Sequence, residues 1–404
     1  MERAIYMKVV HICSSMTGGA GAAAFRLHQA ILSQGVDSKM LTWNDSRESL
    51  RVYRIERPLL YRVLGKIPFI GQRRYSAFIR RYDDVMQAMT FPDAVYDCSH
   101  EAIIQSSDIV HLHWVGNMLN YRKFFTNVRK PIVWTLHDMN PFMGALHFAS
   151  DMEKIAGDEH ALRLERKISE KKALAYKKNP NLTIAPLCQW MKDESSASAA
   201  FSGRPHILVK NCVDVDIFNP QAKERCKLDF RLPSDKKILL YVSQHVNNPR
   251  KGFGLLSSLA SFLSKECVLI VVGSGVIDGD ENIINIGRVN DFSVLSSLYA
   301  SADALILPSV EDNLPNTMLE SLCCGTPVIA FSQGGMKDVV IDGWNGLFAE
   351  SMNENSLLAA IQKFIREGVA ATREEISENA VKLFSPCAVA NSYIAIYESI
   401  LSKL

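Results

Sequence analysis

The sequence lacks long hydrophobic runs, a secretory leader and an excess of charge of either sign. No apolar segment approaches the roughly 20 residues that a membrane-spanning helix needs. The start of the chain, residues 1–8, has no apolar core and no small-residue cleavage site, which predicts a cytoplasmic protein. A second methionine, Met7, indicates that residues 1–6 are a leader or an alternative start. Because 45 Lys and Arg residues stand against 43 Asp and Glu residues, the net charge gives no reason to expect a nucleic-acid partner.

Cysteine and aspartate patterns that hold metals are missing as well. The nine cysteines contain no C-x-x-C, their number is odd, and most lie inside apolar runs. Buried thiols in a reducing compartment are therefore favoured over a disulfide framework or a zinc site. No D-x-D triplet closes a predicted strand, and Asp214-Val215-Asp216, which matches the letters, falls in a predicted linker. We therefore expect no cofactor and no requirement for a divalent metal.

What the chain does contain is an alternation of buried strands and helices, typical of a parallel sheet covered on both faces. In the first half, the sequence predicts a loop at 14–21, a helix at 22–33, and strands at 8–13, 38–43, 108–113, 132–136, 182–185 and 206–209. The pattern restarts near Lys237, with helices at 252–263, 292–300 and 314–323 and strands at 237–242, 268–272, 283–286, 304–307 and 327–331.

These two series predict an α/β protein with two Rossmann-like, doubly wound domains facing a central cleft. The predicted domains cover 1–211 and 212–383, with a linker at 211–227. The tail at 384–404 has helical periodicity, and we expect it to pack back on the first domain. In such folds, ligands bind at the carboxyl ends of the strands.

One segment, 51–81, departs from this pattern by its charge. It contains nine Lys or Arg residues and a single acid, interleaved with aliphatic and aromatic residues. This mixture is typical of a surface that contacts anionic lipid, and Arg73, Arg74, Arg80 and Arg81 are the candidate membrane or acceptor contacts. A solvated loop with a few core-facing side chains is the alternative, and nucleic acid is disfavoured because no nucleic-acid-binding module accompanies the segment.

Two loops carry glycines or paired cations directly after predicted strands. The first, Met16-Thr17-Gly18-Gly19-Ala20-Gly21, lets the backbone approach a phosphate or sugar. The second, Asn247-Asn248-Pro249-Arg250-Lys251-Gly252, places two cations before a helix, as a diphosphate site would. The partial dinucleotide fingerprint Gly19-x-Gly21-x-x-Ala24 favours nicotinamide binding only weakly, since Asp45 is the one acid that the second strand offers for a ribose.

The segment 308–331 combines a loop acid with a helix acid. Asp312 follows the strand at 304–307, Asn313 is placed to cap the next helix, and Glu320 lies inside that helix. A carboxylate on an otherwise apolar helix is costly unless it accepts hydrogen bonds, and ribose hydroxyls would donate them.

Together these motifs resemble those of the retaining glycosyltransferases of family 4, a GT-B group that includes bacterial polysaccharide transferases. The resemblance covers nearly the whole chain. The segments that carry it are the Gly18-Gly19 loop, DIVHLHW at 108–114, TLHD at 135–138, KNCVDVDIFNP at 210–220, Arg250-Lys251-Gly252, Asp312 with Glu320, GTPVIA at 325–330 and the glycine-rich motif at 334–347.

The resemblance implies a role for each matching residue. Arg250 and Lys251 would hold the donor diphosphate, and Glu320 would take the ribose hydroxyls. Asp312 would orient the donor sugar, and His137 would contact it near the reacting carbon. The other donor contacts that the resemblance implies are Gly18, Gly19, Gly273, Val289, Asn290, Asn313 and Leu314.

The implied activity is retaining transfer of a sugar from a UDP- or GDP-sugar to a saccharide or lipid-linked saccharide acceptor. The implied process is bacterial surface polysaccharide biosynthesis, such as exopolysaccharide, capsule or lipopolysaccharide, at the inner face of the cytoplasmic membrane. Attack would occur on the front face, with the leaving phosphate helping to remove the acceptor proton. The protein would stabilise the departing diphosphate electrostatically.

The sequence departs from the family pattern at three places. In place of the family's usual Glu-x7-Glu pair, this chain has Asp312 and Glu320 at the same spacing. The separate arginine that often precedes the lysine in this family is absent, and His245 lies nearby instead. The family's linker Asn-Gly is replaced by Asn211-Cys212. Two alternatives therefore stay open. One is a GT-B-fold nucleotide-sugar epimerase, and the other is an inactive nucleotide-sugar-binding homologue; an NAD-dependent oxidoreductase is a distant third.

Histidines at the strand ends allow two further interpretations. His111 and His113 point to one face of their strand and, with His137, imitate a metal site that has no evident fourth ligand. His137-Asp138 resembles a general-base pair, but the sequence contains no nucleophile motif such as G-x-S-x-G. Polar residues that face a binding cleft are the favoured interpretation.

Overall fold

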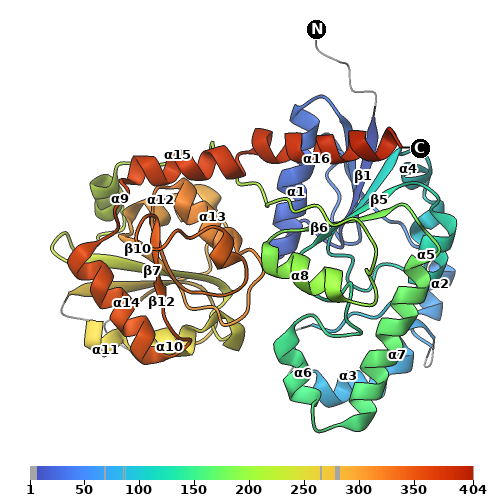
Figure 1. Cartoon of the computed structure of the whole chain (residues 1–404), viewed down its shortest axis with the longest axis horizontal. Helices are drawn as coiled ribbons and strands as arrows, with labels where there is room; N and C mark the ends of the chain where they lie inside the picture. The colour runs from blue at the N-terminus through green and yellow to red at the C-terminus, as the bar shows by residue number, and fades with distance from the viewer. Residues whose placement is uncertain are drawn as a thin grey trace. The chain divides into compact units, whose positions relative to one another are not determined.

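The computed structural model describes residues 7–67, 70–84, 86, 88–263, 266–277 and 283–403 (Figure 1). The expected leader at 1–6 lies outside the described residues, as does Phe69 of the basic segment. The chain forms two compact units. Unit 1 comprises Met1–Val209 and Ala390–Leu404, and unit 2 comprises Lys210–Val389.

Unit 1 is built on a parallel six-stranded sheet in the order β3-β2-β1-β4-β5-β6. The strands are β1 Lys8–Ile12, β2 Asp37–Thr42, β3 Val52–Arg54, β4 Ile109–Leu112, β5 Ile132–Leu136 and β6 Leu182–Pro186. Their Val-, Ile- and Leu-rich sequences are buried on both faces, as expected for a sheet covered by helices on each side. The chain reverses its direction of strand addition between β1 and β4, which makes that point the topological switch of the sheet.

Helices cover both faces of this sheet. One face carries a large aromatic core, in which Tyr121, Phe124 and Phe125 of α5, Tyr176 of α7 and Met191 of α8 pack under the strands. The helices of unit 1 are α1 Gly18–Ser33, α2 Leu59–Leu64, α3 Ser76–Tyr82, α4 Ala102–Gln105, α5 Tyr121–Asn127, α6 Ala149–Ile155, α7 Glu159–Tyr176 and α8 Gln189–Ala197, with 3₁₀ turns η1 Glu48–Leu50, η2 Gly71–Tyr75 and η3 Cys98–His100.

The last helix, α16 Pro386–Leu401, ends in unit 1 and packs on the other face of the sheet, which α1 also covers. The Tyr397 hydroxyl lies 2.6 Å from His111 Nδ1, and the Tyr393 hydroxyl lies 2.7 Å from Thr135 Oγ1. All four side chains are buried. The tail from Ala390 is therefore part of the unit 1 core rather than an appendage.

Unit 2 repeats the same architecture with the sheet order β12-β11-β10-β7-β8-β9, again parallel throughout its described strands. The strands are β7 Lys237–His245, β8 Cys267–Ser274, β9 Ile283–Gly287, β10 Ala304–Leu307, β11 Val328–Phe331 and β12 Gly346–Ala349. The helical elements are α9 Lys223–Asp229, η4 Pro249–Lys251, α10 Phe253–Ser257, α11 Ala260–Leu263, α12 Phe292–Ser301, α13 Asn316–Cys323, η5 Gly334–Asp338, α14 Glu354–Glu367 and α15 Arg373–Phe384. Its switch point lies between β7 and β10.

The prediction of an α/β protein with two doubly wound halves is confirmed. The boundary between the units falls after Val209, against the predicted 211. The prediction of buried thiols is confirmed for eight of the nine cysteines, and Cys387 is exposed. Among the described helices, none has the length and hydrophobicity of a membrane span.

Four local predictions from the sequence are wrong. Residues 206–209 form no strand, since they pair with β6 through a single bridge, Ile184 to His206. The helix predicted at 252–263 divides into α10 and α11. The hydroxyls of Ser257 and Ser258 bond to the carbonyls of Gly254 and Leu255, which competes with helical backbone pairing at this point.

The other two wrong predictions concern the 14–21 loop and the linker. Helix α1 begins at Gly18, four residues earlier than predicted, so the loop after β1 comprises only residues 13–17. The predicted linker at 211–227 is packed against unit 2, because Val213 and Phe218 are fully buried and the Val213 N–H donates to the Phe384 carbonyl.

Candidate functional site

The switch point of unit 2 joins two oppositely charged side chains from adjacent strand ends. Lys251 follows β7 in η4, and Asp312 lies in the loop after β10. The Lys251 Nζ forms an ion pair with Asp312 Oδ2, and the side chains are 28% and 14% exposed. A partly exposed cation at a strand end is suited to an anionic ligand, and its acidic partner is placed to accept hydroxyl hydrogen bonds.

Arg250 lies beside this pair and its conformation is set by backbone contacts. The Asn248 side chain accepts from the Arg250 N–H at 3.1 Å, and the Arg250 carbonyl accepts from the Val310 N–H at 2.9 Å. Arg250 Nη1 donates to the Glu311 carbonyl at 3.4 Å. The loops after β7 and β10 are therefore tied together, which brings Arg250 and Lys251 to the same loop cluster as Asp312.

Two glycines allow these loops to approach so closely. Gly252 has φ +69°, and a Cβ at this position would clash with the Pro308 carbonyl oxygen. Gly334 has φ +50°, and its Cβ would clash with the Asp312 carbonyl oxygen. Both positions need a left-handed backbone and the absence of a side chain, so glycine is required at each for steric reasons.

Glu320 lies within α13 and is 5% exposed. The Tyr299 hydroxyl donates to Glu320 Oε2 at 3.2 Å. The protein itself therefore supplies one of the hydrogen-bond donors that the sequence predicted this buried carboxylate to need. The cap prediction is wrong, because Pro315 and not Asn313 precedes the first residue of α13.

The remaining predicted donor contacts of unit 2 occupy several places. Asn313 and Leu314 are buried beside Asp312 in the same loop. Gly273 lies inside β8 with φ +153°, where a Cβ would clash with the Ser243 carbonyl oxygen. Val289 and Asn290 follow β9, and Asn290 Oδ1 accepts from Arg288 Nε at 2.9 Å. Each residue lies toward or beyond the carboxyl end of its strand, as predicted.

In unit 1, Gly18 and Gly19 form the first turn of α1 rather than a loop. Asp45 Oδ2 accepts hydrogen bonds from Ser15 Oγ at 2.9 Å and from the Met16 N–H at 2.8 Å. The acid considered for a nicotinamide ribose thus holds the turn that precedes α1. Gly21 is required for packing, because a Cβ there would clash with the Ser15 carbonyl oxygen.

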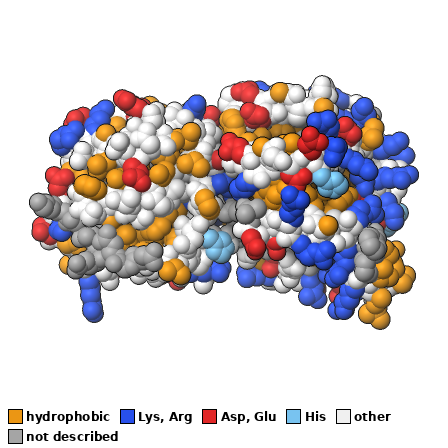
Figure 2. All heavy atoms as spheres, turned by 90° about the horizontal axis from the view of Figure 1, so that it is seen from below, with side chains coloured by type: hydrophobic (Ala, Val, Ile, Leu, Met, Phe, Trp, Pro, Cys, Tyr) orange, Lys and Arg blue, Asp and Glu red, His pale blue; other side chains and the backbone are white. Residues whose placement is uncertain are grey.

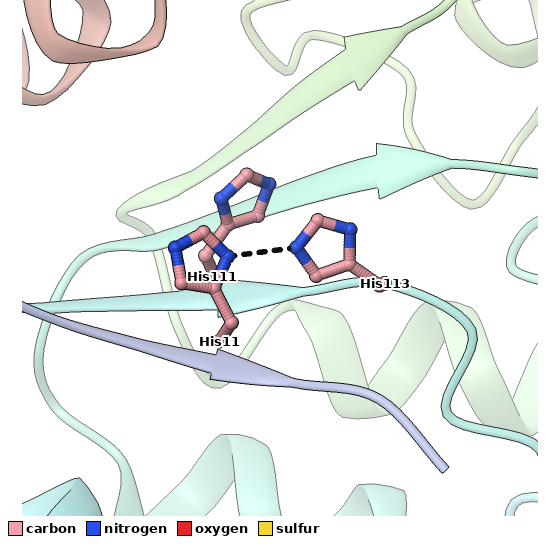
Figure 3. Close-up of side chains that lie close together, drawn as sticks. All are labelled: His11, His111 and His113. Atoms are coloured by element: carbon pink, nitrogen blue, oxygen red, sulfur yellow. Dashed lines mark hydrogen bonds between the residues drawn. The ribbon is translucent and has the colours of Figure 1, made fainter. Parts of the chain in front are cut away.

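Five histidines gather on one face of the unit 1 sheet: His11, His28, His111, His113 and His137. Figure 3 shows His11, His111 and His113. His11 from β1 lies beside both His111 and His113 of the β4 segment, with ring centroids 4.9 and 5.2 Å away, and the rings of His111 and His113 stack on each other at 4.2 Å. The sequence missed His11, which is one polar residue inside an otherwise apolar strand. Burial is the main cause that lowers the pKa of all three rings well below its usual value.

His137 follows β5 and is half-buried. Its Nε2 lies 3.2 Å from His113 Nδ1. Burial lowers its pKa to about 4, against the smaller opposing effect of Asp138. His137 is therefore neutral near pH 7, and its ring is oriented by His113.

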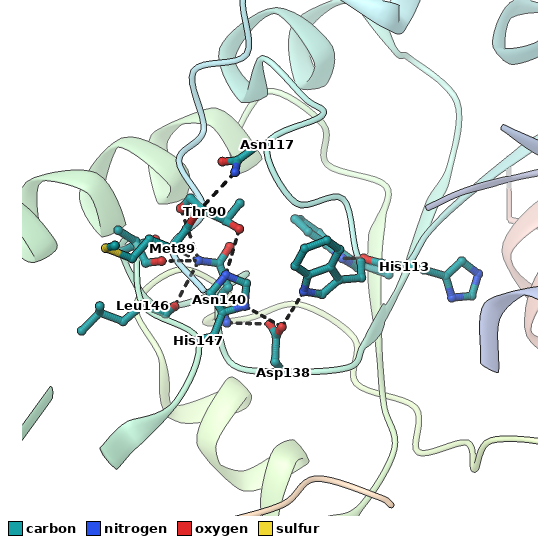
Figure 4. Close-up of polar contacts among 12 residues, drawn as sticks. Met89, Thr90, His113, Asn117, Asp138, Asn140, Leu146 and His147 are labelled. Carbon is teal, nitrogen blue, oxygen red and sulfur yellow. Dashed lines mark hydrogen bonds and ion pairs between the residues drawn. The ribbon is translucent and has the colours of Figure 1, made fainter. Parts of the chain in front are cut away.

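Asp138 forms the centre of a second network, drawn in Figure 4. It accepts hydrogen bonds from Trp114 Nε1 at 2.8 Å and from the Asn140 N–H at 3.0 Å, and it pairs with His147 Nδ1 at 2.6 Å. His147 Nε2 lies 2.8 Å from the Thr90 hydroxyl. Although burial opposes the effect, these contacts lower the pKa of Asp138, so it is ionised. The general-base pair of His137 and Asp138, which the sequence disfavoured, finds no support here, because Asp138 pairs with His147.

The two networks meet at a small cavity of about 10 Å³, the space of about one water molecule. Its lining includes His113, His137, Asp138 and His147. Neither Thr90 nor His147 was selected from the sequence, since each lies in a segment without strand or helix periodicity.

The basic segment forms an exposed surface on unit 1. All nine of its Lys and Arg side chains are exposed, and Figure 2 shows Lys and Arg side chains gathered over this unit with hydrophobic side chains beside them. On α2, Leu59, Leu60 and Val63 are 72%, 63% and 52% exposed. In contrast, Phe78 and Tyr82 of α3 are buried, so the core-facing interpretation holds for that helix.

The four predicted contact arginines differ in their surroundings. Arg74 and Arg81 face Asp93 and Asp158 at 3.9 and 3.1 Å. Arg73 Nε donates to the Gly65 carbonyl at 3.0 Å, which keeps its charge at the surface beside α2. Arg80 is exposed on α3.

Comparison with known proteins gives a family match in unit 2. Residues 236–367 match the family model described as glycosyl transferases group 1. The D-inositol 3-phosphate glycosyltransferase of Mycolicibacterium smegmatis is 27% identical over 204 residues, which are 47% of this chain and 46% of that protein. This chain thus spans about half the length of such curated relatives.

Solved structures share the fold over almost the full chain. Sucrose-phosphate synthase from Thermosynechococcus elongatus has a TM-score of 0.70 at 17% identity, covering 98% of this chain and 100% of that one. Anabaena Alr3699/HepE in complex with UDP-glucose has a TM-score of 0.62 at 15% identity, covering 99% and 100%. The architecture is that of GT-B glycosyltransferases, and the match over 236–367 supports a glycosyltransferase.

Proposed function

We propose that this chain is a retaining glycosyltransferase of family 4 that moves a sugar from a nucleotide-diphosphate-sugar to an acceptor hydroxyl. The observation that carries the proposal is the Lys251–Asp312 pair at the switch point of unit 2, with Arg250 beside it. The cations suit a diphosphate, and the carboxylate suits a sugar hydroxyl. Glu320 on α13 is the ribose contact in this proposal.

The donor is a UDP- or GDP-sugar. The likeness in fold to a protein solved with UDP-glucose supports this class of ligand. In this proposal Arg250 and Lys251 neutralise the charge that develops on the leaving diphosphate, so that no divalent metal is needed. The leaving phosphate assists removal of the acceptor proton, because the acceptor attacks the face that the diphosphate leaves.

The acceptor is a lipid-linked saccharide of a bacterial surface polysaccharide, met at the inner face of the cytoplasmic membrane. The exposed cations and the exposed Leu59, Leu60 and Val63 of α2 support this assignment. Cations attract anionic lipid headgroups, and apolar side chains enter the interface between headgroups and acyl chains.

A thermal-shift screen across UDP- and GDP-sugars tests donor binding, since a ligand that binds the folded state raises the melting temperature. We expect one nucleotide-sugar class to stabilise the protein and Lys251→Ala to abolish the shift. Products are then analysed with and without an acceptor extract. Conversion of the donor sugar without acceptor would instead identify an epimerase, and binding without any turnover would identify an inactive homologue.

A further inference from the structure

A chain of hydrogen bonds joins three histidines across three neighbouring strands of unit 1. His11 Nδ1 lies 2.9 Å from His113 Nε2, and His113 Nδ1 lies 3.2 Å from His137 Nε2. The register explains this path, because His11 pairs with His111 and Leu112 pairs with Trp134. Each step crosses one strand and advances two residues, which keeps all three side chains on one face of the sheet.

The three rings are neutral, and a neutral imidazole has one donor nitrogen and one acceptor nitrogen. The hydrogen bonds that link the three histidines can therefore all run in one of two directions. In the first, His11 carries its proton on Nδ1, and every bond runs toward His137. In the second, His137 carries its proton on Nε2, and every bond runs toward His11. Burial lowers the pKa of His137 to about 4 and holds that of His11 and His113 well below its ordinary value. The rings are therefore uncharged near pH 7, and both directions of hydrogen bonding are chemically available.

The surroundings of His11 decide between these directions. Its Nε2 is buried and has no hydrogen-bond partner among the described residues. The neighbouring rings are engaged elsewhere, His28 with Ser38 Oγ at 2.7 Å and the Leu50 carbonyl at 3.0 Å, and His111 with hydroxyls at both nitrogens. The second direction would leave a buried N–H at His11 Nε2 without an acceptor. The first leaves only an unprotonated Nε2, whose lone pair lacks a donor. Orphaned buried N–H groups are the rarer and costlier case.

We propose that His11 and His113 are positioning residues that fix His137 as the tautomer protonated on Nδ1. Because His137 Nε2 is occupied by His113, the nitrogen left for a ligand is Nδ1, which then donates. His137 thus offers an N–H to an oxygen of a bound sugar and does not act there as a base. This role in sugar binding rests on the proposed glycosyltransferase function, whereas the tautomer follows from the fold.

The nitrogens of His11, His111 and His113 also lie within 4.8 Å of one another, which is a loose metal-ligand arrangement. Five of their six nitrogens already have hydrogen-bond partners. A dication there would meet neutral rings and hydroxyls, with no carboxylate in the set to balance its charge. The hydrogen-bonded relay therefore accounts for the cluster better than a metal site does.

Nitrogen NMR of the full chain labelled in histidine tests the tautomer directly, because protonated and unprotonated ring nitrogens differ widely in chemical shift. We expect protonated Nδ1 in His11, His113 and His137, with assignment of the His137 signals by His137→Asn. Protonated Nε2 in His137 would overturn the proposal. Addition of Zn²⁺ should leave these signals in place, and a Zn²⁺-induced shift of His11, His111 and His113 would overturn it in favour of a metal site.

Variants extend the test to function. The Asn amide nitrogen stands near the place of His Nδ1, and the Gln amide nitrogen stands near that of Nε2. We therefore expect His137→Asn to keep about tenfold more kcat than His137→Gln, the effect of about one hydrogen bond. Equal losses would contradict the donor role.

The relay itself is tested by His11→Phe, with His28→Asn as the control in the same cluster but outside the relay. We expect His11→Phe to change the His137 signals and to lower kcat about tenfold with little change in KM. The control should leave the His137 signals unchanged. If His11→Phe does not fold, the wild-type spectrum alone decides. Failure to find any transfer would refute the proposed function but not the tautomer.

Discussion

The Tyr397 hydroxyl lies 2.6 Å from His111 Nδ1, although 286 residues separate the two along the chain. This contact seats α16 on the histidine-rich face of the unit 1 sheet, next to the bond between Tyr393 and Thr135. The end of the sequence therefore closes the layer that holds His11, His113 and His137 in place.

Tyr397→Phe should destabilise unit 1 by about 1–3 kcal/mol, because it leaves a buried His111 nitrogen without its partner. Denaturant unfolding followed by tryptophan fluorescence measures this change. Tyr61→Phe is the matched control, since it keeps the ring contact with Tyr96 and should cost little. Equal midpoints for wild type and Tyr397→Phe would contradict the role of this bond.

Acid should unfold unit 1 before unit 2. Burial lowers the pKa of His28 and His137 to about 4, and it lowers that of His11, His111 and His113 well below its ordinary value. The unfolded chain takes up these protons near pH 6.5 and the folded chain does not, so stability falls as the pH drops below 6.5. Each histidine contributes about 1.4 kcal/mol per pH unit until its folded pKa is reached.

Unfolding measured at pH 7 and pH 5.5 tests this expectation, because lowered carboxylate pKa values act only at lower pH. Unit 2 is the internal control, since His245 is its single histidine. The same loss of stability in both units would contradict the assignment of the effect to the buried cluster.

Lys251→Ala should lower transfer by a factor of about 10² or more, as expected when one charge-stabilising group is lost. Steady-state kinetics with the donor identified by thermal shift measures the effect. Lys237→Ala is the matched control, because Lys237 begins the same strand, β7, and pairs with Asp303 at its opposite end. Wild-type turnover in Lys251→Ala would refute the diphosphate site.

Transfer should persist in excess EDTA. The reason is that Arg250 and Lys251 supply the positive charge that a bound cation provides in metal-dependent transferases. Assays with EDTA, and with EDTA followed by Mg²⁺ or Mn²⁺, make the measurement. Loss on chelation with recovery on metal addition would show that Asp312 or Asp138 recruits a cation with the donor.

Vesicle binding should require acidic lipid and weaken with salt, because exposed charges are screened within about 10 Å at 0.1 M ionic strength. Replacing Arg62, Lys66, Arg73 and Arg80 with Gln removes about 1 kcal/mol each and should release the protein. A second variant tests the exposed leucines: the double substitution Leu59→Ser and Leu60→Ser should weaken vesicle binding without changing the charge. Equal binding to neutral vesicles would contradict the electrostatic attraction.

The order of strands and helices was predictable from the sequence because a strand buried on both faces of a parallel sheet needs a continuous run of apolar residues. The places of Lys251 and Asp312 were predictable for a related reason, since polar residues in the loops after such runs lie at the ligand edge of the sheet. Glu320 was selected for a different reason, as a carboxylate inside an otherwise apolar helix. The geometric link between Lys251 and Asp312 depends on the pairing of β7 with β10, which local sequence does not encode.

Tertiary structure alone decided the partners. His11 looked like an isolated polar residue in a strand, and its role appeared only when β1 paired with β4 and placed it against His113. Asp138 directly follows His137, the partner considered from the sequence, yet it pairs with His147, nine residues further on. Sequence periodicity reports which face of an element is buried, whereas strand order and register determine which buried polar groups meet, and these are set by contacts distant along the chain.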